Sequence, residues 1–444
     1  MALAPSAPRG PAGARDGRWL LLWAALIGVA GALATVAFHL GMAFAERLAT
    51  GHPGSLVAAA QALPAWRRAL TPAMGGIAAG VILEISRRIA PGDTRTDYLE
   101  AIAVGDGRQG VAGPLLRALS SLCTIASGGS VGREGAMVSL SAATGSWLGQ
   151  IGRLTADDLR LLLACGAAAG FASAYDAALS GAIFIAEIIY GTLAIRSLGP
   201  LMVASVIANA TVHQVLGYEP VYRIPPLHVA TLWELPVFLG LGLALGALAP
   251  PFLFLLEGAR AGFKRLPLGA PARLAVGGLL VGAISIARPE VWGNGYSVVN
   301  DVLQHPWPLA LIGMVLAAKL LATAATTGSG AVGGVFTPTI FVGAMLGLIG
   351  GDLVHSLWPA TSLPVVYSVI GMGAFLAATT HAPLMSFLIV FEMTLEYQLV
   401  PALMLACLAA FHVSRALRRR SIYQEALHRG TAIEDEPGES APGR

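Results

Sequence analysis

The sequence predicts an all-α membrane protein that crosses the bilayer many times and is built of two antiparallel helical halves with re-entrant helices. Three observations support this class: the composition, a series of short apolar runs, and an internal repeat. Of 444 residues, 55 % are hydrophobic and only 12 % are charged, and the mean hydropathy is +0.70. A soluble domain has about 25 % charged residues. The chain is therefore expected to lie in a lipid bilayer, and its net charge of +3 gives no reason to expect nucleic-acid binding.

The apolar runs are numerous, but several are too short to cross a membrane, which takes roughly 20 apolar residues. Short runs broken by Gly and Pro indicate helices that enter the bilayer without spanning it, and such helices must be buried in protein or line a wet cavity. In chain order the runs are Trp19–Phe44, Pro72–Ile85, Leu159–Ala174, Gly181–Leu193, Leu198–Val215, Leu232–Leu256, Leu274–Ile286, Leu309–Ala325, Ile340–Leu353, Val365–Ala378, Leu384–Phe391 and Leu399–Val413.

Arginines cluster outside the first and the last apolar run, which predicts that both termini are cytoplasmic. The first run, of about 26 residues, is too long for a signal peptide and is expected to be retained. The clusters are Arg9, Arg15 and Arg18, and Arg415, Arg418, Arg419 and Arg420. The predicted division is a disordered N-terminus (1–18), a first transmembrane repeat (19–217), an external linker (218–231), a second, inverted repeat (232–423) and a short cytoplasmic tail (424–444).

Two pairs of segments carry the internal repeat. The segment Gly166–Glu187 matches Gly371–Glu392 at a constant offset of 205, and Ser127–Ala136 matches Ser329–Pro338 at an offset of 202. Chance matching of Ala- and Gly-rich sequence is the alternative, because small residues are common at helix contacts in membranes. A repeat unit with an odd number of crossings makes the second half inverted, and inverted repeats with broken helices commonly form a substrate site where they meet.

The stretch Ser127–Ala136, SGGSVGREGA, is the candidate site. Its glycines permit a close backbone approach, and the apolar run Met137–Ile151 behind it is expected to be a helix. The start of a helix offers unpaired N–H groups and partial positive charge, which attract an anion. The carboxylate of Glu134 would compete with a mobile anion there and would act as a gate; the alternative is a polar turn in which Arg133 and Glu134 pair.

The repeat places Phe336 opposite Glu134. The second glycine-rich helix start therefore brings an aromatic ring and the backbone N–H groups of Val335 and Phe336. This arrangement predicts a site for a small anion without a dedicated cation, since partial charges attract a halide without trapping it. The filter backbone would be formed by Gly132, Arg133, Gly135 and Gly334.

These motifs resemble the CLC family of chloride channels and proton-coupled chloride exchangers, and most closely its bacterial ClcB-type members. The resemblance covers Trp19–Leu427 and rests on GREG at Gly132–Gly135, GGVFTP at Gly333–Pro338, and SIYQEAL at Ser421–Leu427. It implies a homodimer of the bacterial inner membrane with one anion pathway per subunit. It further implies that Glu134 is the gate and that the Tyr423 hydroxyl binds chloride; an interfacial anchor is the alternative role for this tyrosine.

The sequence departs from the family pattern in three places. The first filter motif, G-S-G-I-P, is missing, and either Thr94 or Thr96 is the candidate source of its hydroxyl. Ala136 replaces the proline usual after GREG. The tandem glutamates of many exchangers read Glu187-Ile188 here, which weakens the expected proton coupling. Glu187 and its repeat mate Glu392 are expected to be structural, satisfying polar groups at helix ends or a subunit interface.

The remaining polar residues predict neither a metal site nor a cofactor. The three cysteines lie far apart in apolar sequence, and no histidine has metal-ligand spacing. Lys319 lies within an apolar run and is a functional candidate by default; snorkelling or pairing with a carboxylate are the alternatives.

The sequence therefore predicts chloride transport that is channel-like or weakly proton-coupled. A stoichiometric chloride/proton antiporter and a fluoride exporter are the near alternatives. An intramembrane enzyme that uses Glu134 or His381 is disfavoured, because nothing supplies a nucleophile–base pair, so the chain is not expected to be an enzyme.

Overall fold

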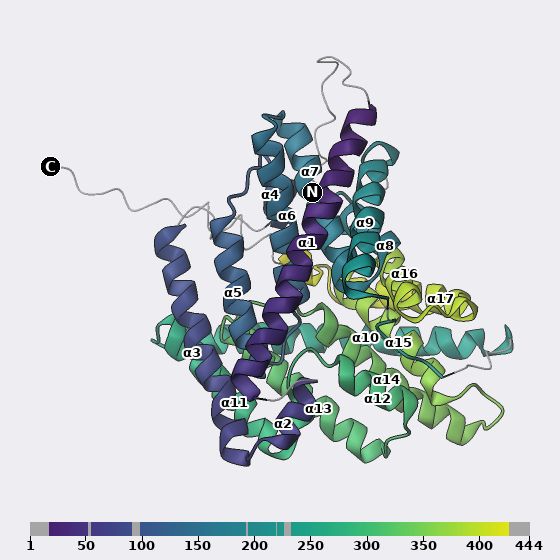
Figure 1. Ribbon diagram of the computed structural model, residues 1–444. Helices are drawn as coiled ribbons and strands as arrows, with labels where there is room; N and C mark the ends of the chain where they lie inside the picture. Colours follow the sequence, from purple (N-terminus) through teal and green to yellow (C-terminus); the bar gives the residue numbers. More distant parts are fainter. Residues whose placement is uncertain are drawn as a thin grey trace.

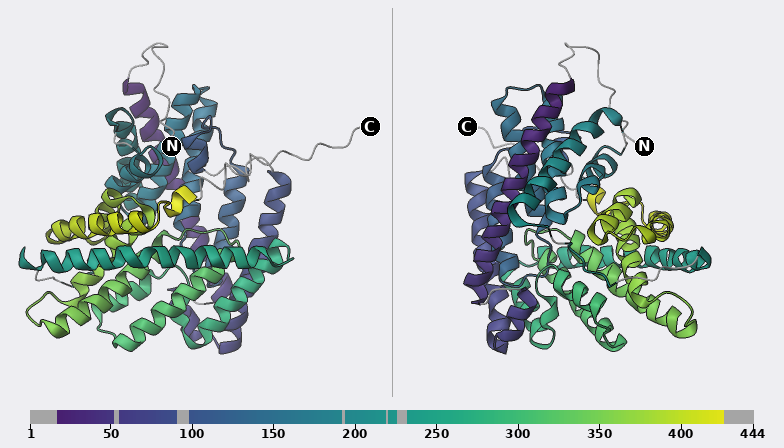
Figure 2. Two further views of the ribbon diagram at one scale, coloured as in Figure 1. Left: turned by 180° about the vertical axis from the view of Figure 1, so that it is seen from behind. Right: turned by 45° about the vertical axis from the view of Figure 1, so that its right-hand side comes forward.

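The structure is a computed structural model that describes residues 17–51, 55–90, 98–191, 194–218, 220–225 and 232–425. Within these ranges the regular elements are helices, apart from one isolated β-bridge, so the predicted all-α class is confirmed. Figures 1 and 2 show the helices of the first part of the chain (purple to teal) gathered beside those of the second part (teal to yellow).

The helices before residue 218 include both long spans and short pieces. They are α1 (Gly17–Thr50), α2 (Leu56–Ala62), α3 (Ala65–Ile89), α4 (Tyr98–Ala103), α5 (Ala112–Ala126), α6 (Glu134–Ile151), α7 (Ala156–Tyr175), α8 (Ala178–Phe184), the π-helix η1 (Ile185–Ile189) and α9 (Ile195–Leu216).

The helices after the linker have a similar mixture of lengths. They are the 3₁₀ turn η2 (Leu232–Glu234), α10 (Leu235–Lys264), α11 (Ala270–Ala287), the 3₁₀ turn η3 (Pro289–Val291), α12 (Tyr296–Gln304), α13 (Leu309–Gly328), α14 (Phe336–Leu357), α15 (Pro364–Thr380), α16 (Pro383–Thr394), the 3₁₀ turn η4 (Tyr397–Leu399) and α17 (Val400–Leu417).

Eight helices of the described residues are long and apolar enough to cross a bilayer: α1, α3, α9, α10, α11, α13, α14 and α17. Four apolar segments are shorter, namely α5, α8 with η1, α15 and α16. A helix rises 1.5 Å per residue, so these shorter segments cannot span a hydrocarbon core of about 30 Å. Three of them, α8 with η1, α15 and α16, are broken helices that the short apolar runs predicted.

Helix pairs that follow each other in the chain pack closely in both parts of the molecule. Helix α6 packs on α7, and α14 packs on α15. The two contacts use equivalent glycines: a Cβ on Gly166 would meet the Ser141 carbonyl, and a Cβ on Gly371 would meet the Gly343 carbonyl. Only glycine allows the backbones to come this close. Gly166 and Gly371 are also the first residues of the matching segments found in the sequence.

A further pair of residues at the offset of 205 occupies equivalent places. Asp176 ends α7 and His381 ends α15, both with a left-handed backbone (φ 55° and 58°). Each of these residues therefore turns the chain sharply before the next short helix, α8 or α16. Few residues other than glycine, Asn, Asp and His are common in this conformation, and the broken helices start where the chain adopts it.

The two glutamates that end the repeated segments cap each other's helices. Glu187 accepts hydrogen bonds from the N–H groups of Leu384 (3.1 Å) and Met385 (2.7 Å) at the start of α16. Glu392, in α16, accepts from the N–H groups of Leu179 and Ser180 (both 2.8 Å) at the start of α8. The structural role expected for these glutamates is therefore seen as an exchange of caps between the two parts of the chain.

The structure differs from the sequence expectations at several helix ends. Helix α6 begins at Glu134 and not at Met137, and α10 continues to Lys264, eight residues beyond the predicted Leu256. Helix α5 was not predicted at all, because Arg117 and several serines interrupt its apolar face. Most of the predicted terminal segments and much of the predicted linker lie outside the described residues.

Candidate functional site

The two glycine-rich segments meet as a short antiparallel bridge. The N–H of Gly132 donates to the carbonyl of Gly334, and the N–H of Gly334 donates to the carbonyl of Gly132, both at 2.8 Å. These are the two glycines that the offset of 202 aligned. The bridge holds the start of α6, at Glu134, beside the start of α14, at Phe336.

Both helix starts keep backbone N–H groups available. Arg133 and Val335 occupy the cap positions, and neither side chain makes a capping hydrogen bond. The first N–H groups of a helix have no partner within it and carry partial positive charge. Two such starts that face one region create an electropositive spot formed by backbone alone, which suits an anion.

The Glu134 side chain is buried at this junction, with only 3 % of its surface exposed. Its Oε1 atom accepts a hydrogen bond from the Thr337 hydroxyl and a long one, at 3.5 Å, from the Tyr296 hydroxyl. Its Oε2 atom has no hydrogen-bond partner among the described residues. Arg133 does not form an ion pair with Glu134 in the structure, so the alternative of a paired polar turn is not what this region adopts.

A cavity of about 270 Å³ lies against the junction. The predicted residues Glu134, Gly135, Gly334, Val335, Phe336 and Tyr423 line it. Gly132 and Arg133 do not line it, and the contribution of Gly132 is the bridge. Thr94 and Thr96 lie outside the described residues, but Tyr98, two positions after Thr96 and at the start of α4, lines the cavity.

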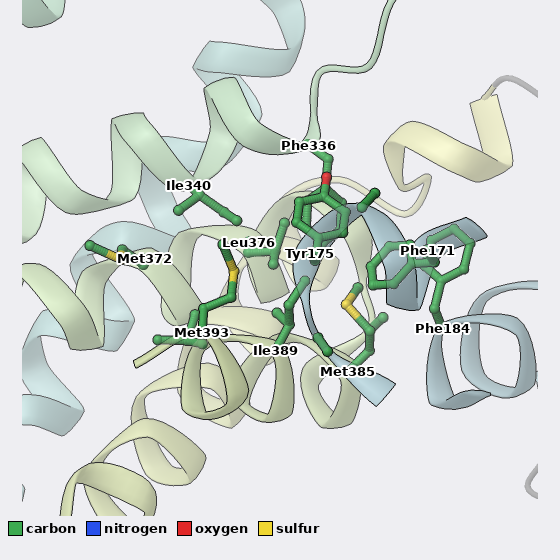
Figure 3. Packing of buried hydrophobic residues seen from close by; sticks show 14 of the residues in the cluster. Phe171, Tyr175, Phe184, Phe336, Ile340, Met372, Leu376, Met385, Ile389 and Met393 are labelled. Atoms are coloured by element: carbon green, nitrogen blue, oxygen red, sulfur yellow. The ribbon is translucent and has the colours of Figure 1, made fainter. Parts of the chain in front are cut away.

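Aromatic rings from four helical segments form one wall of this cavity. Phe336 packs against Phe171 (5.4 Å between ring centroids) and Tyr175 (4.9 Å). Phe184 stacks on Phe171 at 4.3 Å and meets Tyr423 edge-on at 5.7 Å. Figure 3 shows Phe336 and Tyr175 next to each other, with Phe171 and Phe184 beside them. This wall brings the region of Tyr423, near the end of the chain, against α7 and α8.

Sequence reasoning missed several residues of the site. Thr337 lies in the motif GGVFTP and Tyr296 lies in the stretch WGNGYS (Trp292–Ser297), but nothing in either stretch indicates that these hydroxyls reach Glu134. Two arginines also line the cavity, Arg117 in α5 and Arg260 in α10. In the sequence Arg260 forms a positive cluster with Lys264 and Arg265, which predicts a cytoplasmic loop, whereas the structure places Arg260 within a helix.

Lys319 is fully buried in α13, and neither alternative proposed for it is correct. Its ammonium group donates to the backbone carbonyls of Val291 (2.9 Å) and Gly293 (2.6 Å), and it lies 5.6 Å from the Phe341 ring. It neither snorkels nor pairs with a carboxylate. These carbonyls belong to the loop that leads to Tyr296, so Lys319 supports the segment that covers Glu134.

Comparison with known proteins agrees with these observations. The profile described as "Voltage gated chloride channel" matches residues 75–415. A protein of Ralstonia nicotianae, named as a ClcB-like chloride channel protein, is 51 % identical over 92 % of this chain and 97 % of its own length. A protein of Citrobacter koseri, named as the voltage-gated ClC-type chloride channel ClcB, is 44 % identical over 91 % of this chain and 98 % of its own length.

Solved structures share the fold at lower sequence identity. A slow cyanobacterial Cl⁻/H⁺ antiporter superposes with a TM-score of 0.84 at 23 % identity and covers 96 % of this chain and 100 % of its own. A CLC-type fluoride/proton antiporter gives 0.77 at 22 % identity, over 93 % and 98 % of the two chains. The predicted architecture, an inverted repeat of two antiparallel helical halves with re-entrant helices, is thereby confirmed as the fold. On its sequence and its fold, the chain belongs to the voltage-gated chloride channel family, CLC.

Proposed function

We propose that this protein transports chloride across a bacterial inner membrane, with both termini in the cytoplasm and with Glu134 as the gate. The observation that carries the proposal is the junction of two repeat-related helix starts, where a buried carboxylate, two sets of helix N–H groups and a tyrosine hydroxyl border one cavity. We assign residues 19–217 and 232–423 to the two inverted halves.

In this proposal the anion is held mainly by dipoles. The N–H groups of Val335 and Phe336 and the hydroxyl of Tyr423 bind chloride, which enters a cavity whose wall is otherwise rich in aromatic carbon. Partial charges hold a halide firmly enough to dehydrate it and loosely enough to release it. Arg117 and Arg260 add a positive potential that raises the local anion concentration. Glu134 competes with chloride when ionised and withdraws when protonated.

We propose weak proton coupling, because neither candidate for a second proton carrier is available. Ile188 occupies the position after Glu187, and both carboxylate oxygens of Glu187 accept hydrogen bonds from the start of α16. Both oxygens of this carboxylate are therefore engaged as a helix cap, and releasing them to carry a proton would leave the start of α16 without its acceptors. A stoichiometric antiporter is the second candidate, favoured by the fold shared with proteins named as antiporters.

The deciding experiment records chloride and pH together from proteoliposomes under a chloride gradient. Chloride efflux with little proton movement is expected, whereas a fixed proton count per chloride identifies an antiporter. Comparison of fluoride with chloride efflux tests fluoride export in the same vesicles.

The Glu134→Gln variant tests the gate, since it keeps the shape of the side chain and removes its titration. We expect altered chloride flux that no longer responds to pH. Glu84→Gln is the matched control, because Glu84 lies on an exposed face of α3 and pairs with Arg87. Flux and pH response that remain those of the wild type in Glu134→Gln would refute the gate.

A further inference from the structure

The Tyr175 side chain is a buried polar group that the proposed mechanism does not use. It is the last residue of α7, it has no exposed surface, and its hydroxyl has no hydrogen-bond partner among the described residues. A buried hydroxyl without a partner is costly, and proteins rarely tolerate it unless a ligand or water completes it.

The surroundings of this hydroxyl point to a ligand in the cavity. Tyr175 lines the cavity together with Glu134, Phe336 and Tyr423. The polar groups near it are Glu134, Thr337, Tyr296 and Tyr423, and the Thr337 hydroxyl is near enough for a weak interaction but does not meet full hydrogen-bond geometry with it. Of these, the Thr337 and Tyr296 hydroxyls already donate to the Glu134 carboxylate.

The chemistry of the wall decides which kind of ligand fits. The Tyr175 ring is fixed between Phe171 (4.7 Å) and Phe336 (4.9 Å), so the hydroxyl is held in position at little further entropic cost. A fixed O–H donor beside the N–H groups at the start of α14 complements an anion and not a cation. A ligand in this part of the cavity lies between the Glu134 carboxylate and the Tyr423 hydroxyl.

We propose that the Tyr175 hydroxyl donates a hydrogen bond to the transported chloride and is, with Tyr423, one of two tyrosines that bind it. This inference rests on the proposed function and adds a binding residue to the same site. An anion shared by two hydroxyls and by helix N–H groups replaces the water that it loses on entering the cavity.

The test is a chloride titration of the purified full-length protein by calorimetry, with the Tyr175→Phe variant. This substitution removes the hydroxyl and keeps the ring that packs on Phe171 and Phe336. Loss of a hydrogen bond to a charged group is expected to weaken chloride binding about tenfold. Tyr222→Phe is the matched control: its hydroxyl is also buried and unpartnered in the described region, but it does not line the cavity, and its chloride affinity is expected to stay that of the wild type.

Melting temperatures measured with and without chloride distinguish an effect of Tyr175→Phe on chloride binding from an effect on folding. In chloride-free buffer Tyr175→Phe is expected to melt at or above the wild-type temperature, because it removes an unsatisfied group. Chloride should then stabilise it less than it stabilises the wild type. A lower melting temperature without chloride would mean that the hydroxyl has a protein partner, and it would overturn the inference.

The double variant Tyr175→Phe/Tyr423→Phe provides a second check. Two hydroxyls on one anion are expected to give non-additive losses of chloride affinity. If the wild type binds and transports chloride and Tyr175→Phe binds it with the same affinity, the inference about Tyr175 is wrong. The proposed function is not affected by that result. Wild-type protein that neither binds nor transports chloride would overturn both.

Discussion

Lys319 and Glu134 are buried ionisable residues that the protein treats differently. Lys319 has two strong backbone acceptors and an aromatic ring, and it therefore stabilises the loop Val291–Gly293. Glu134 has donors on one oxygen only. A fully satisfied buried charge is a structural element, whereas a half-satisfied one is poised to exchange its partners. We therefore expect replacement of Lys319 to lower stability and replacement of Glu134 to change the pH response of chloride flux.

Replacement of Lys319 by Met is expected to lower stability first. Two buried carbonyls lose their donor, and a hydrogen bond to a charged group contributes about 1.5–3 kcal/mol. The melting temperature in detergent, followed by tryptophan fluorescence, should fall by several degrees. The only other lysine, Lys264, is exposed at the end of α10, and Lys264→Met is the matched control. Equal melting of the Lys319 variant and the wild type would show that the loop is held by other contacts.

At the scale of elements, the short helices α8 and α16 depend on each other. Each begins with N–H groups that cannot be satisfied within the helix, and each receives a glutamate from the opposite repeat. Because no water is present in the hydrocarbon to replace these caps, their loss costs more than at a soluble surface. The exchange also fixes how the two halves meet, since neither short helix is capped by its own half.

The exchanged caps predict a symmetric loss of stability. Glu187→Ala and Glu392→Ala should each lower the free energy of unfolding by about 1–3 kcal/mol. The melting temperatures of the two variants should therefore fall by similar amounts. Glu84→Ala is the control, because an exposed pair with Arg87 contributes roughly 0–1 kcal/mol. An effect from only one of the two glutamates would contradict the idea that the caps are equivalent.

Some of these features can be predicted from the sequence and others cannot. Glycine spacing aligned Gly132 with Gly334 as repeat mates, because a close backbone approach demands glycine in both repeats, but it did not indicate that these two residues bond to each other. Hydropathy found the long helices but missed α5, whose serines and Arg117 face other helices and the cavity. The partners of Glu134 were not predictable, since Thr337 lies 203 positions away in the sequence and a hydroxyl leaves no periodic signal. The same holds for the carbonyls that bind Lys319.

At the scale of the whole molecule, the cavity is lined by residues from many separate parts of the chain. The residues that line it come from α4 to α8, α10, α14 and the Tyr423 region of the same chain. The family resemblance implies a homodimer with one such pathway in each subunit. Large apolar side chains, such as Leu22, Phe44 and Leu48, remain exposed on helices that cross the bilayer, where lipid or a second copy would cover them.

A mixed dimer tests this independence of the two pathways. Subunits with different tags allow purification of dimers that contain one wild-type copy and one Glu134→Gln copy. If each cavity works alone, the pH-dependent part of chloride flux in liposomes should fall to about half of the wild-type value, because one gate still titrates. Dimers with two Glu134→Gln copies supply the baseline, and wild-type dimers with both tags control for the purification. Complete loss of the pH response in the mixed dimer would mean that the two subunits gate together. That result would contradict an independent gate in each subunit.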